Sequence, residues 1–143
     1  MTKRKSASRK WWLALLAASM AVLVVAMLLP GPTLEWFYSP SHALGRLLGR
    51  LEQTAFPFSR WFHMLMFAWL AACLWGVFPR LRGWQVAGVL LALAVMGELA
   101  QIPVPGRNPA WEDLADDLLG IVVGVLLAAA LRGWAGRTRR PAS

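Results

Sequence analysis

Charged side chains are scarce in this sequence of 143 residues, at 15% of the total, whereas hydrophobic residues make up 58%. A soluble domain carries about a quarter charged residues, so this chain has too few to cover a surface that faces water. The mean hydropathy of +0.51 agrees with this reading. The composition excludes a disordered chain and a soluble enzyme core, and it indicates a single integral membrane domain.

Cysteine is nearly absent, because Cys73 stands alone in an apolar block and no intrachain disulfide can form. Acidic residues are also few, at seven against fifteen Lys and Arg, which gives a net charge of +8. In a soluble protein such an excess would suggest a nucleic-acid partner. Here the basic residues lie at the ends of apolar segments, as in membrane proteins. We therefore expect membrane lipids as partners and no nucleic acid.

Long apolar stretches are abundant, and four of them are long enough to cross a membrane, since a helix needs about 20 residues for about 30 Å of hydrocarbon. The predicted fold class is all-α, a polytopic membrane protein with four transmembrane helices. The spans are predicted at about 11–30, 61–78, 84–102 and 114–134, within a membrane domain at 11–134 between basic tails at 1–10 and 135–143. The first span exceeds the apolar core of about 7–15 residues in a signal peptide, which favours an uncleaved helix.

Lys and Arg are unevenly divided between the two sides of the membrane. Eleven of the fifteen lie in the two tails and in the connection between the second and third spans. The other side has the remaining four, Arg46, Arg50, Arg60 and Arg107. The positive-inside rule therefore predicts that both termini are cytoplasmic.

The longest connection joins the first two spans and contains an amphipathic segment from Ser41 to Thr54. Its leucines share one helical face, while its charged residues lie elsewhere. We predict a short amphipathic helix on the outer membrane surface. A helix packed over the mouth of the bundle fits the same pattern equally well.

Polar groups inside spans are costly in a bilayer and mark functional sites. His63 lies near the start of the second span, Glu98 and Gln101 near the end of the third, and Asp113 and Asp117 at the start of the fourth. Because successive spans run in opposite directions, all of these groups fall on the extracytoplasmic side, within about 10 Å of its boundary. We predict one polar site there. The spacing of the groups is not that of a metal site, and no cofactor is indicated.

One stripe of the fourth span contains Asp113, Asp117, Gly120 and Gly124, at intervals of three or four residues. The two glycines allow another helix to approach closely, so the acids on this stripe are expected to face the mouth of the bundle. Asp116 lies about 100° around the helix from Asp117, and it is predicted to face headgroups or another loop.

The connector before the fourth span contains two predicted local structures. Pro105 and Gly106 suit the central positions of a type II turn, which needs positive φ at the glycine. Asn108 is predicted to cap the fourth helix, with Pro109 as its first residue.

This short connector also restrains Arg107, the nearest cation to the predicted site. A partly desolvated carboxylate such as Glu98 either finds a cation or takes up a proton. We therefore expect Arg107 to pair with Glu98 or Asp113. If Glu98 is the partner, a double variant should be less unstable than the two single effects added together.

From Arg60 to Gly124 the sequence resembles the VanZ-like family, named for an accessory protein of teicoplanin resistance. The resemblance rests on Arg60-Trp61-Phe62-His63 with Phe67, Glu98-Leu99-Ala100-Gln101, Pro105-Gly106-Arg107, and Asp113 with Gly120 and Gly124. The sequence departs from the family pattern at Ser59, often an acid, at Ala110, often a polar residue, and at Asp117, usually Asn. The resemblance implies a small polytopic protein of the bacterial inner membrane, without defining its chemistry.

These observations favour a protein that modulates the cell envelope or its susceptibility to glycopeptide antibiotics. A cell-wall or lipid-linked ligand would then be bound by Arg60, Gln101, Arg107, Asp113 and Asp117. One alternative is a membrane enzyme for a lipid-linked or phosphorylated envelope substrate, with His63 or Glu98 as general acid/base and Arg107 stabilising developing charge. A second alternative is proton-coupled transport through Glu98 and Asp117. All three remain hypotheses, and the sequence does not indicate an oligomeric state.

Overall fold

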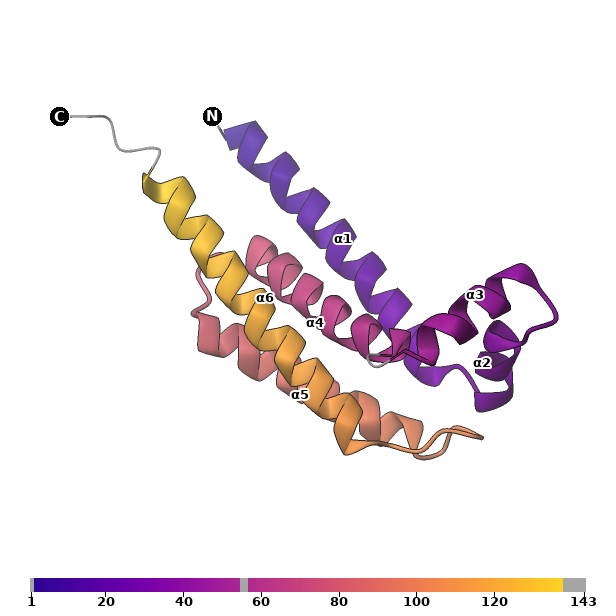
Figure 1. Cartoon of the computed structure of the whole chain (residues 1–143). Coiled ribbons are helices and arrows are strands. Elements are labelled where there is room, and N and C mark those ends of the chain that lie inside the picture. The colour runs from indigo at the N-terminus through magenta and orange to yellow at the C-terminus, as the bar shows by residue number, and fades with distance from the viewer. Residues whose placement is uncertain (1, 55–56, 138–143) are drawn as a thin grey trace.

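The computed structural model describes the backbone of residues 2–54 and 57–137, with side chains for 9–54 and 57–134. This part of the chain forms six helices (Figure 1): α1 (Thr2–Leu28), α2 (Gly31–Tyr38), α3 (Ala43–Glu52), α4 (Phe58–Val77), α5 (Gly83–Gln101) and α6 (Trp111–Arg137). The four longest helices, α1, α4, α5 and α6, each contain a stretch long and apolar enough to span a membrane. The all-α fold class with four spans is therefore confirmed.

Prolines mark the ends of several helices, because a proline lacks the backbone N–H and disfavours helical backbone in the residue before it. Pro30 separates α1 from α2, Pro57 precedes the first residue of α4, and Pro79 lies just after the end of α4. Helix α4 begins at Phe58, three residues before the predicted span. Arg60 and His63 consequently lie in its first two turns.

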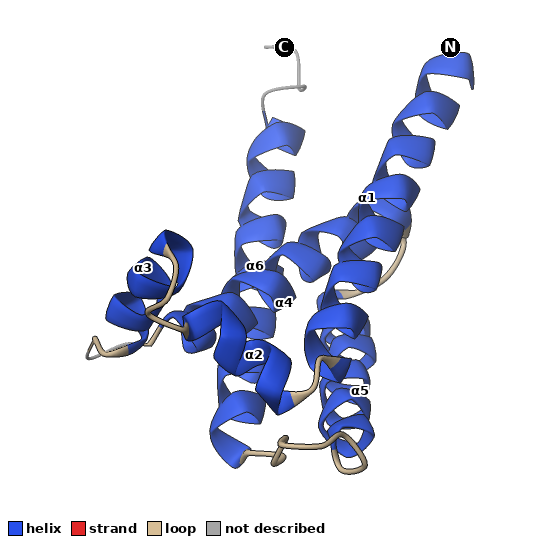
Figure 2. Ribbon diagram, turned by 90° about the vertical axis from the view of Figure 1, so that its right-hand side faces the viewer, coloured by secondary structure: helices blue, strands red, loops and turns tan. Residues whose placement is uncertain are grey.

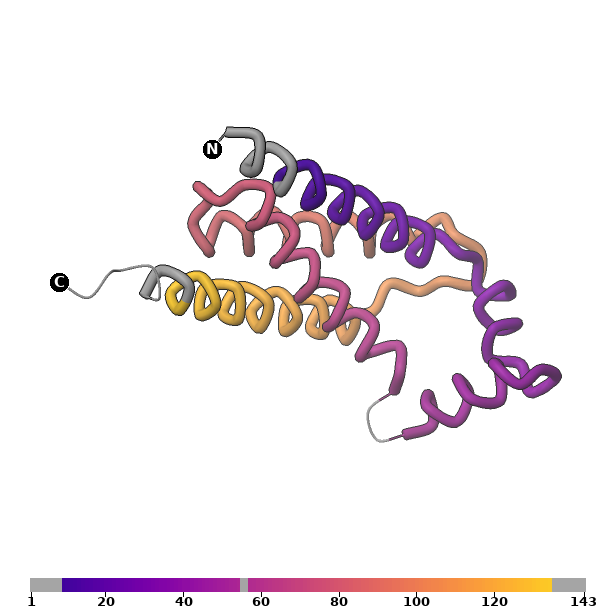
Figure 3. The backbone as a smooth tube through the Cα atoms, turned by 90° about the horizontal axis from the view of Figure 1, so that it is seen from above, coloured from indigo at the N-terminus to yellow at the C-terminus, as the bar shows by residue number. Residues whose placement is uncertain are grey.

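Helix α4 occupies the centre of the bundle, where it contacts α1, α5 and α6, while the described residues of α1 and α6 do not contact each other. The start of α1 and the end of α6, as far as they are described, lie at one end of the bundle (Figures 1 and 3), together with the 78–82 connection, and we call this the basic end. The opposite end, where α1 stops and α4 and α6 start, is called the polar end.

Helices α4 and α6 run parallel and pack closely enough for side chain to meet backbone. A β-carbon added at Gly120 would overlap the backbone of Met64, and one added at Gly124 would overlap the backbone of Ala68. Each pair of residues is offset by the same interval along the two helices, so a single line of contact runs along them. Glycine is required on this line because any larger residue would push the helices apart.

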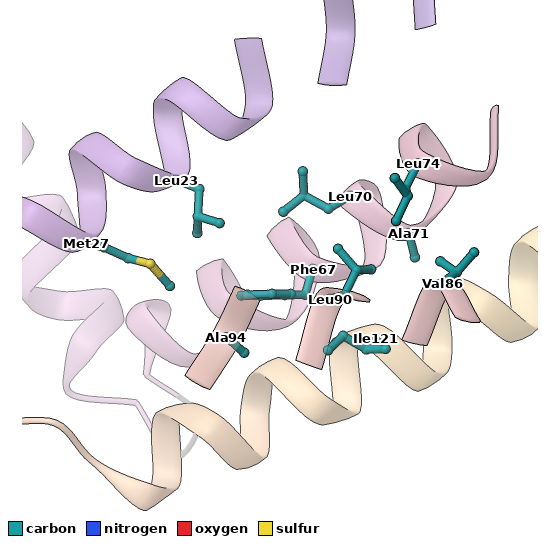
Figure 4. Packing of buried hydrophobic residues seen from close by; sticks show 10 residues of the cluster. All are labelled: Leu23, Met27, Phe67, Leu70, Ala71, Leu74, Val86, Leu90, Ala94 and Ile121. Atoms are coloured by element: carbon teal, nitrogen blue, oxygen red, sulfur yellow. The ribbon is translucent and has the colours of Figure 1, made fainter. Parts of the chain in front are cut away.

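The apolar core lies between α1, α4, α5 and α6 in the middle of the bundle (Figure 4). Its buried side chains are Leu23, Met27, Phe67, Leu70, Ala71, Leu74, Val86, Leu90, Ala94 and Ile121. The buried polar side chains are instead concentrated at the polar end, and they are Glu98, Gln101, Asp116 and Asp117. The fold thus places the apolar core in the middle of the bundle and the buried polar side chains at the polar end.

Helices α2 and α3 project sideways from the polar end (Figure 2). The amphipathic helix predicted at 41–54 is present as α3, whereas α2 was not predicted. Leu44, Leu47 and Leu51 of α3 are exposed. Exposed leucines on a helix beside the bundle favour the membrane-surface placement over a helix packed across the bundle mouth.

The orientation of the bundle in the membrane can be tested with reporter fusions. If the basic end is cytoplasmic, as the distribution of Lys and Arg predicts, an alkaline phosphatase reporter fused after Ser143 should be inactive. The same reporter inserted near Pro57 should be active, because that connection would be extracytoplasmic. The reverse pattern would place the polar end in the cytoplasm and would contradict the predicted topology.

Candidate functional site at the polar end

The most deeply buried polar contact joins α4 to α6. His63 Nδ1 lies 2.8 Å from Asp117 Oδ1, and the side chains are 16% and 0% exposed. The other carboxylate oxygen of Asp117 is also buried and has no hydrogen-bond partner among the described residues. Since Nδ1 contacts Asp117, the ring nitrogen left to meet a ligand is Nε2.

A second contact between the same helices joins Arg60 to Asp116. The guanidinium donates from Nε and Nη2 to the two carboxylate oxygens, at 2.7 and 2.8 Å. Asp116 is only 2% exposed, so the prediction that it faces headgroups is wrong. Because α6 packs directly on α4, residues 100° apart on α6 lie on either side of the contact line, and α4 supplies a partner to each.

The connector between α5 and α6 folds as the predicted turn. Gly106 has a φ of 72°, and the Arg107 N–H donates to the Val104 carbonyl over 3.1 Å. The turn is fixed against the start of α2, where the Gly31 N–H donates to the Pro105 carbonyl over 2.9 Å. Gly31 and Gly106 touch closely, and a β-carbon on Gly31 would overlap the backbone of Gly106. The position of Arg107 is therefore set by backbone contacts.

Arg107 does not pair with Glu98 or Asp113, in contrast to the sequence prediction. Its Nη2 donates instead to the carbonyl of Ala26, over 2.7 Å. The residue four positions after Ala26 is Pro30, which has no N–H to donate to this carbonyl as a helical residue would. The guanidinium satisfies the carbonyl that the proline leaves free, and Arg107 Nε is buried without a hydrogen-bond partner among the described residues.

Glu98 has a different neighbour from the predicted one. Its Oε2 accepts from the Ala110 N–H at 3.1 Å, while its buried Oε1 has no partner among the described residues. Helix α6 starts at Trp111, so the predicted cap at Asn108 is two residues too early. The Glu98 carboxylate on α5 thus lies at the N-terminus of α6, where the helix dipole is positive and stabilises a negative charge.

The separate surroundings of Glu98 and Arg107 change the expected result of the double-variant experiment. Glu98→Gln and Arg107→Ala should now lower the melting temperature additively in a thermal-shift cycle, because residues with no shared partner act independently. Double variants that combine Glu98→Gln or Arg107→Ala with Asp117→Asn provide further cycles within the same site, with which the additivity of the first pair is compared. A double variant markedly more stable than the sum would mean that the two charges do interact.

A cavity of about 460 Å³ opens among α1, α2, α3 and α4 at the polar end. Of the predicted site residues, His63, Gln101 and Arg107 line it, whereas Arg60, Glu98, Asp113 and Asp117 do not. Its other lining residues are Leu23, Ala26, Met27, Leu34, Tyr38, Glu52, Phe58, Ser59 and Phe62. One wall is thus apolar, and the other carries an imidazole, a guanidinium and an amide.

Three polar lining residues were not predicted: Tyr38, Glu52 and Ser59. Glu52 accepts from both the N–H of Ser59, at 3.0 Å, and its hydroxyl, at 2.5 Å, so α3 supplies a carboxylate to the start of α4. Burial, and then the nearby Glu52 carboxylate, raise the pKa of Tyr38 despite the opposing effect of Arg107. Tyr38 therefore keeps its proton and presents an O–H donor near neutral pH.

Asp113 lies in the first turn of α6, half-buried, and near enough to His63, Glu98 and Asp117 for electrostatic interaction. It does not reach the cavity. Within the described part of the chain, no group of three or more His, Cys, Asp or Glu side chains is arranged to hold a metal ion. The cavity itself presents an oriented imidazole, a fixed cation and the Tyr38 hydroxyl.

The fold and the site together define a small four-span membrane protein with a buried polar cluster beneath a cavity at one end. A sequence model of the VanZ/LLP1 family matches residues 12–132, and the chain belongs to this family. The match extends the resemblance from the polar motifs to α1 and most of α6. No curated protein and no solved structure matches the chain.

Proposed function

We propose that this protein works in the bacterial inner membrane, where the cavity at its polar end binds the anionic group of a cell-wall or lipid-linked ligand. By binding that ligand, the protein would change the susceptibility of the cell to glycopeptide antibiotics. The observation that carries the proposal is the state of Arg107. Its guanidinium lines the cavity and is held by a backbone carbonyl rather than by a carboxylate.

A cation fixed in this way keeps its charge available to a ligand. An acid partner would cancel much of the attraction for an anion, whereas a carbonyl only positions the guanidinium. Buried polar atoms are nearly always hydrogen-bonded, so the unpartnered Arg107 Nε favours a ligand oxygen at this position. The apolar wall formed by α1 and α2 suits a ligand that also carries a hydrocarbon part.

Binding is tested with a polyprenyl phosphate as the probe and the matching polyprenol as its uncharged control. Purified wild-type protein should bind the phosphate more tightly, and Arg107→Gln should lose that preference. Arg46→Gln is the matched control, because Arg46 lies on the exposed face of α3 and donates to Pro40. Equal binding of the two probes by wild-type protein would overturn the proposal for an anionic ligand.

The cellular part is tested by expressing the same three proteins in a susceptible host and measuring growth inhibition by teicoplanin. Wild type and Arg46→Gln should shift the inhibitory concentration equally, and Arg107→Gln should not shift it. If the protein binds the polyprenyl phosphate but does not shift the inhibitory concentration, the proposed binding site stands and the proposed role in antibiotic susceptibility is wrong.

The second candidate function is a membrane enzyme for a phosphorylated envelope substrate, and the His63–Asp117 pair favours it. A carboxylate on Nδ1 orients an imidazole whose Nε2 could exchange a proton with a bound substrate. Incubating the polyprenyl phosphate with the protein distinguishes the two functions. An enzyme would release a product, and His63→Gln would stop the release without preventing binding.

A further inference from the structure

A groove lies toward the basic end of the bundle, away from the cavity at the polar end. Since the described residues of α1 and α6 do not touch, a face of α4 lies open between them and forms the floor of the groove, whose volume is about 550 Å³. The floor consists of small residues of α4 spaced four apart, Ala68, Ala72 and Gly76, which share one helical face. Gly124 and Ala128 of α6 continue this small-residue surface.

Indole rings form the rigid walls of the groove. Trp12 of α1 packs directly on Gly76, where a β-carbon would overlap its ring. Trp69 donates from Nε1 to the Ser19 hydroxyl over 2.8 Å, which ties α4 to α1. Between Leu65 and Gly76 the helix rises about 16 Å, close to half of the roughly 30 Å hydrocarbon thickness. The groove therefore has the length of one membrane leaflet.

Arg132 of α6 lies at the mouth of the groove. Its guanidinium stacks 4.6 Å from the centroid of the Trp75 ring and donates from Nη2 to the Pro79 carbonyl over 2.7 Å. Stacking and one backbone bond fix the planar group but leave most of its five N–H donors for other partners.

We propose that this groove is a binding site for an anionic phospholipid of the leaflet at the basic end. One acyl chain would lie along the small residues of α4, and the phosphate would bind the guanidinium of Arg132. Basic pockets between transmembrane helices are suited to anionic headgroups. A second transmembrane helix would fit the apolar floor but would leave the fixed cation without a partner, so charge complementarity selects the lipid.

The proposal is tested by native mass spectrometry on the purified full-length protein, with phosphatidylglycerol and phosphatidylcholine of identical acyl chains. One cation near a lipid surface contributes about 1 kcal/mol, which corresponds to about fivefold in affinity. Wild-type protein should prefer phosphatidylglycerol by at least that factor, and Arg132→Gln should lose the preference. Arg50→Gln, on the exposed surface of α3, is the matched control and should keep it.

A second pair of variants tests the acyl-chain part. Ala128→Phe fills the groove and should weaken binding of both lipids severalfold, whereas Ala129→Phe, on the exposed neighbouring face, should not. A melting curve for each variant establishes that it is folded. Equal affinity for the two lipids in wild-type protein, or equal effects of the two phenylalanines, would overturn the proposal. A changed oligomeric state in Ala128→Phe with unchanged lipid binding would assign the groove to a second copy of the chain instead.

Discussion

Gly120→Leu should leave almost no folded protein in the membrane, and Gly124→Leu should have nearly the same effect. At each position the new side chain would enter the backbone of α4, at Met64 or Ala68, which a rotamer change cannot relieve. Separating α6 from α4 would also break the His63–Asp117 contact. Each variant would then lose both the packing of α6 on α4 and the polar contact between them.

Gly88→Leu is the matched control, because nothing lies within 4 Å of a β-carbon at Gly88. It is the same substitution in another span, at a position with open space, so it should give a normal yield. Yields are compared by fluorescence-detected size exclusion of detergent extracts. Normal yields for Gly120→Leu and Gly124→Leu would mean that this stripe of α6 faces lipid.

The spans could be predicted because each is decided by local composition. A run of about 20 apolar residues satisfies its own backbone within the helix, so hydropathy alone identifies it. Helix α2 was missed for the opposite reason. It is short, and its start depends on Pro30 and on the contact of Gly31 with the distant Gly106, which no local pattern encodes.

The depth of the site could be predicted in the same way, but not which side chains form pairs. Helix direction placed His63, Glu98 and Asp117 at one end, whereas pairing depends on how the helices rotate against one another. Proximity in sequence favoured Arg107 with Glu98. The decisive fact was a carbonyl on α1 freed by Pro30, far away in the chain.

Within the site, His63→Ala should be the most destabilising truncation of a polar side chain. Asp117 is fully buried, and His63 supplies its observed hydrogen bond. Removing one partner of a buried ion pair leaves the other uncompensated, which costs about 3–5 kcal/mol. Asp117→Asn should cost less, because a neutral amide is cheaper to bury than a lone carboxylate.

The decisive measurement is a cycle of chemical unfolding in detergent with His63→Ala, Asp117→Asn and the double variant. The double variant should be more stable than His63→Ala alone, because it no longer buries an unpaired carboxylate. His42→Ala is the matched control, since His42 accepts the Gly45 N–H at the start of α3, and the loss of such a cap costs about 1 kcal/mol. If His63→Ala cost no more than His42→Ala, Asp117 would have to be neutral already, and the pair would be an uncharged hydrogen bond rather than an ion pair.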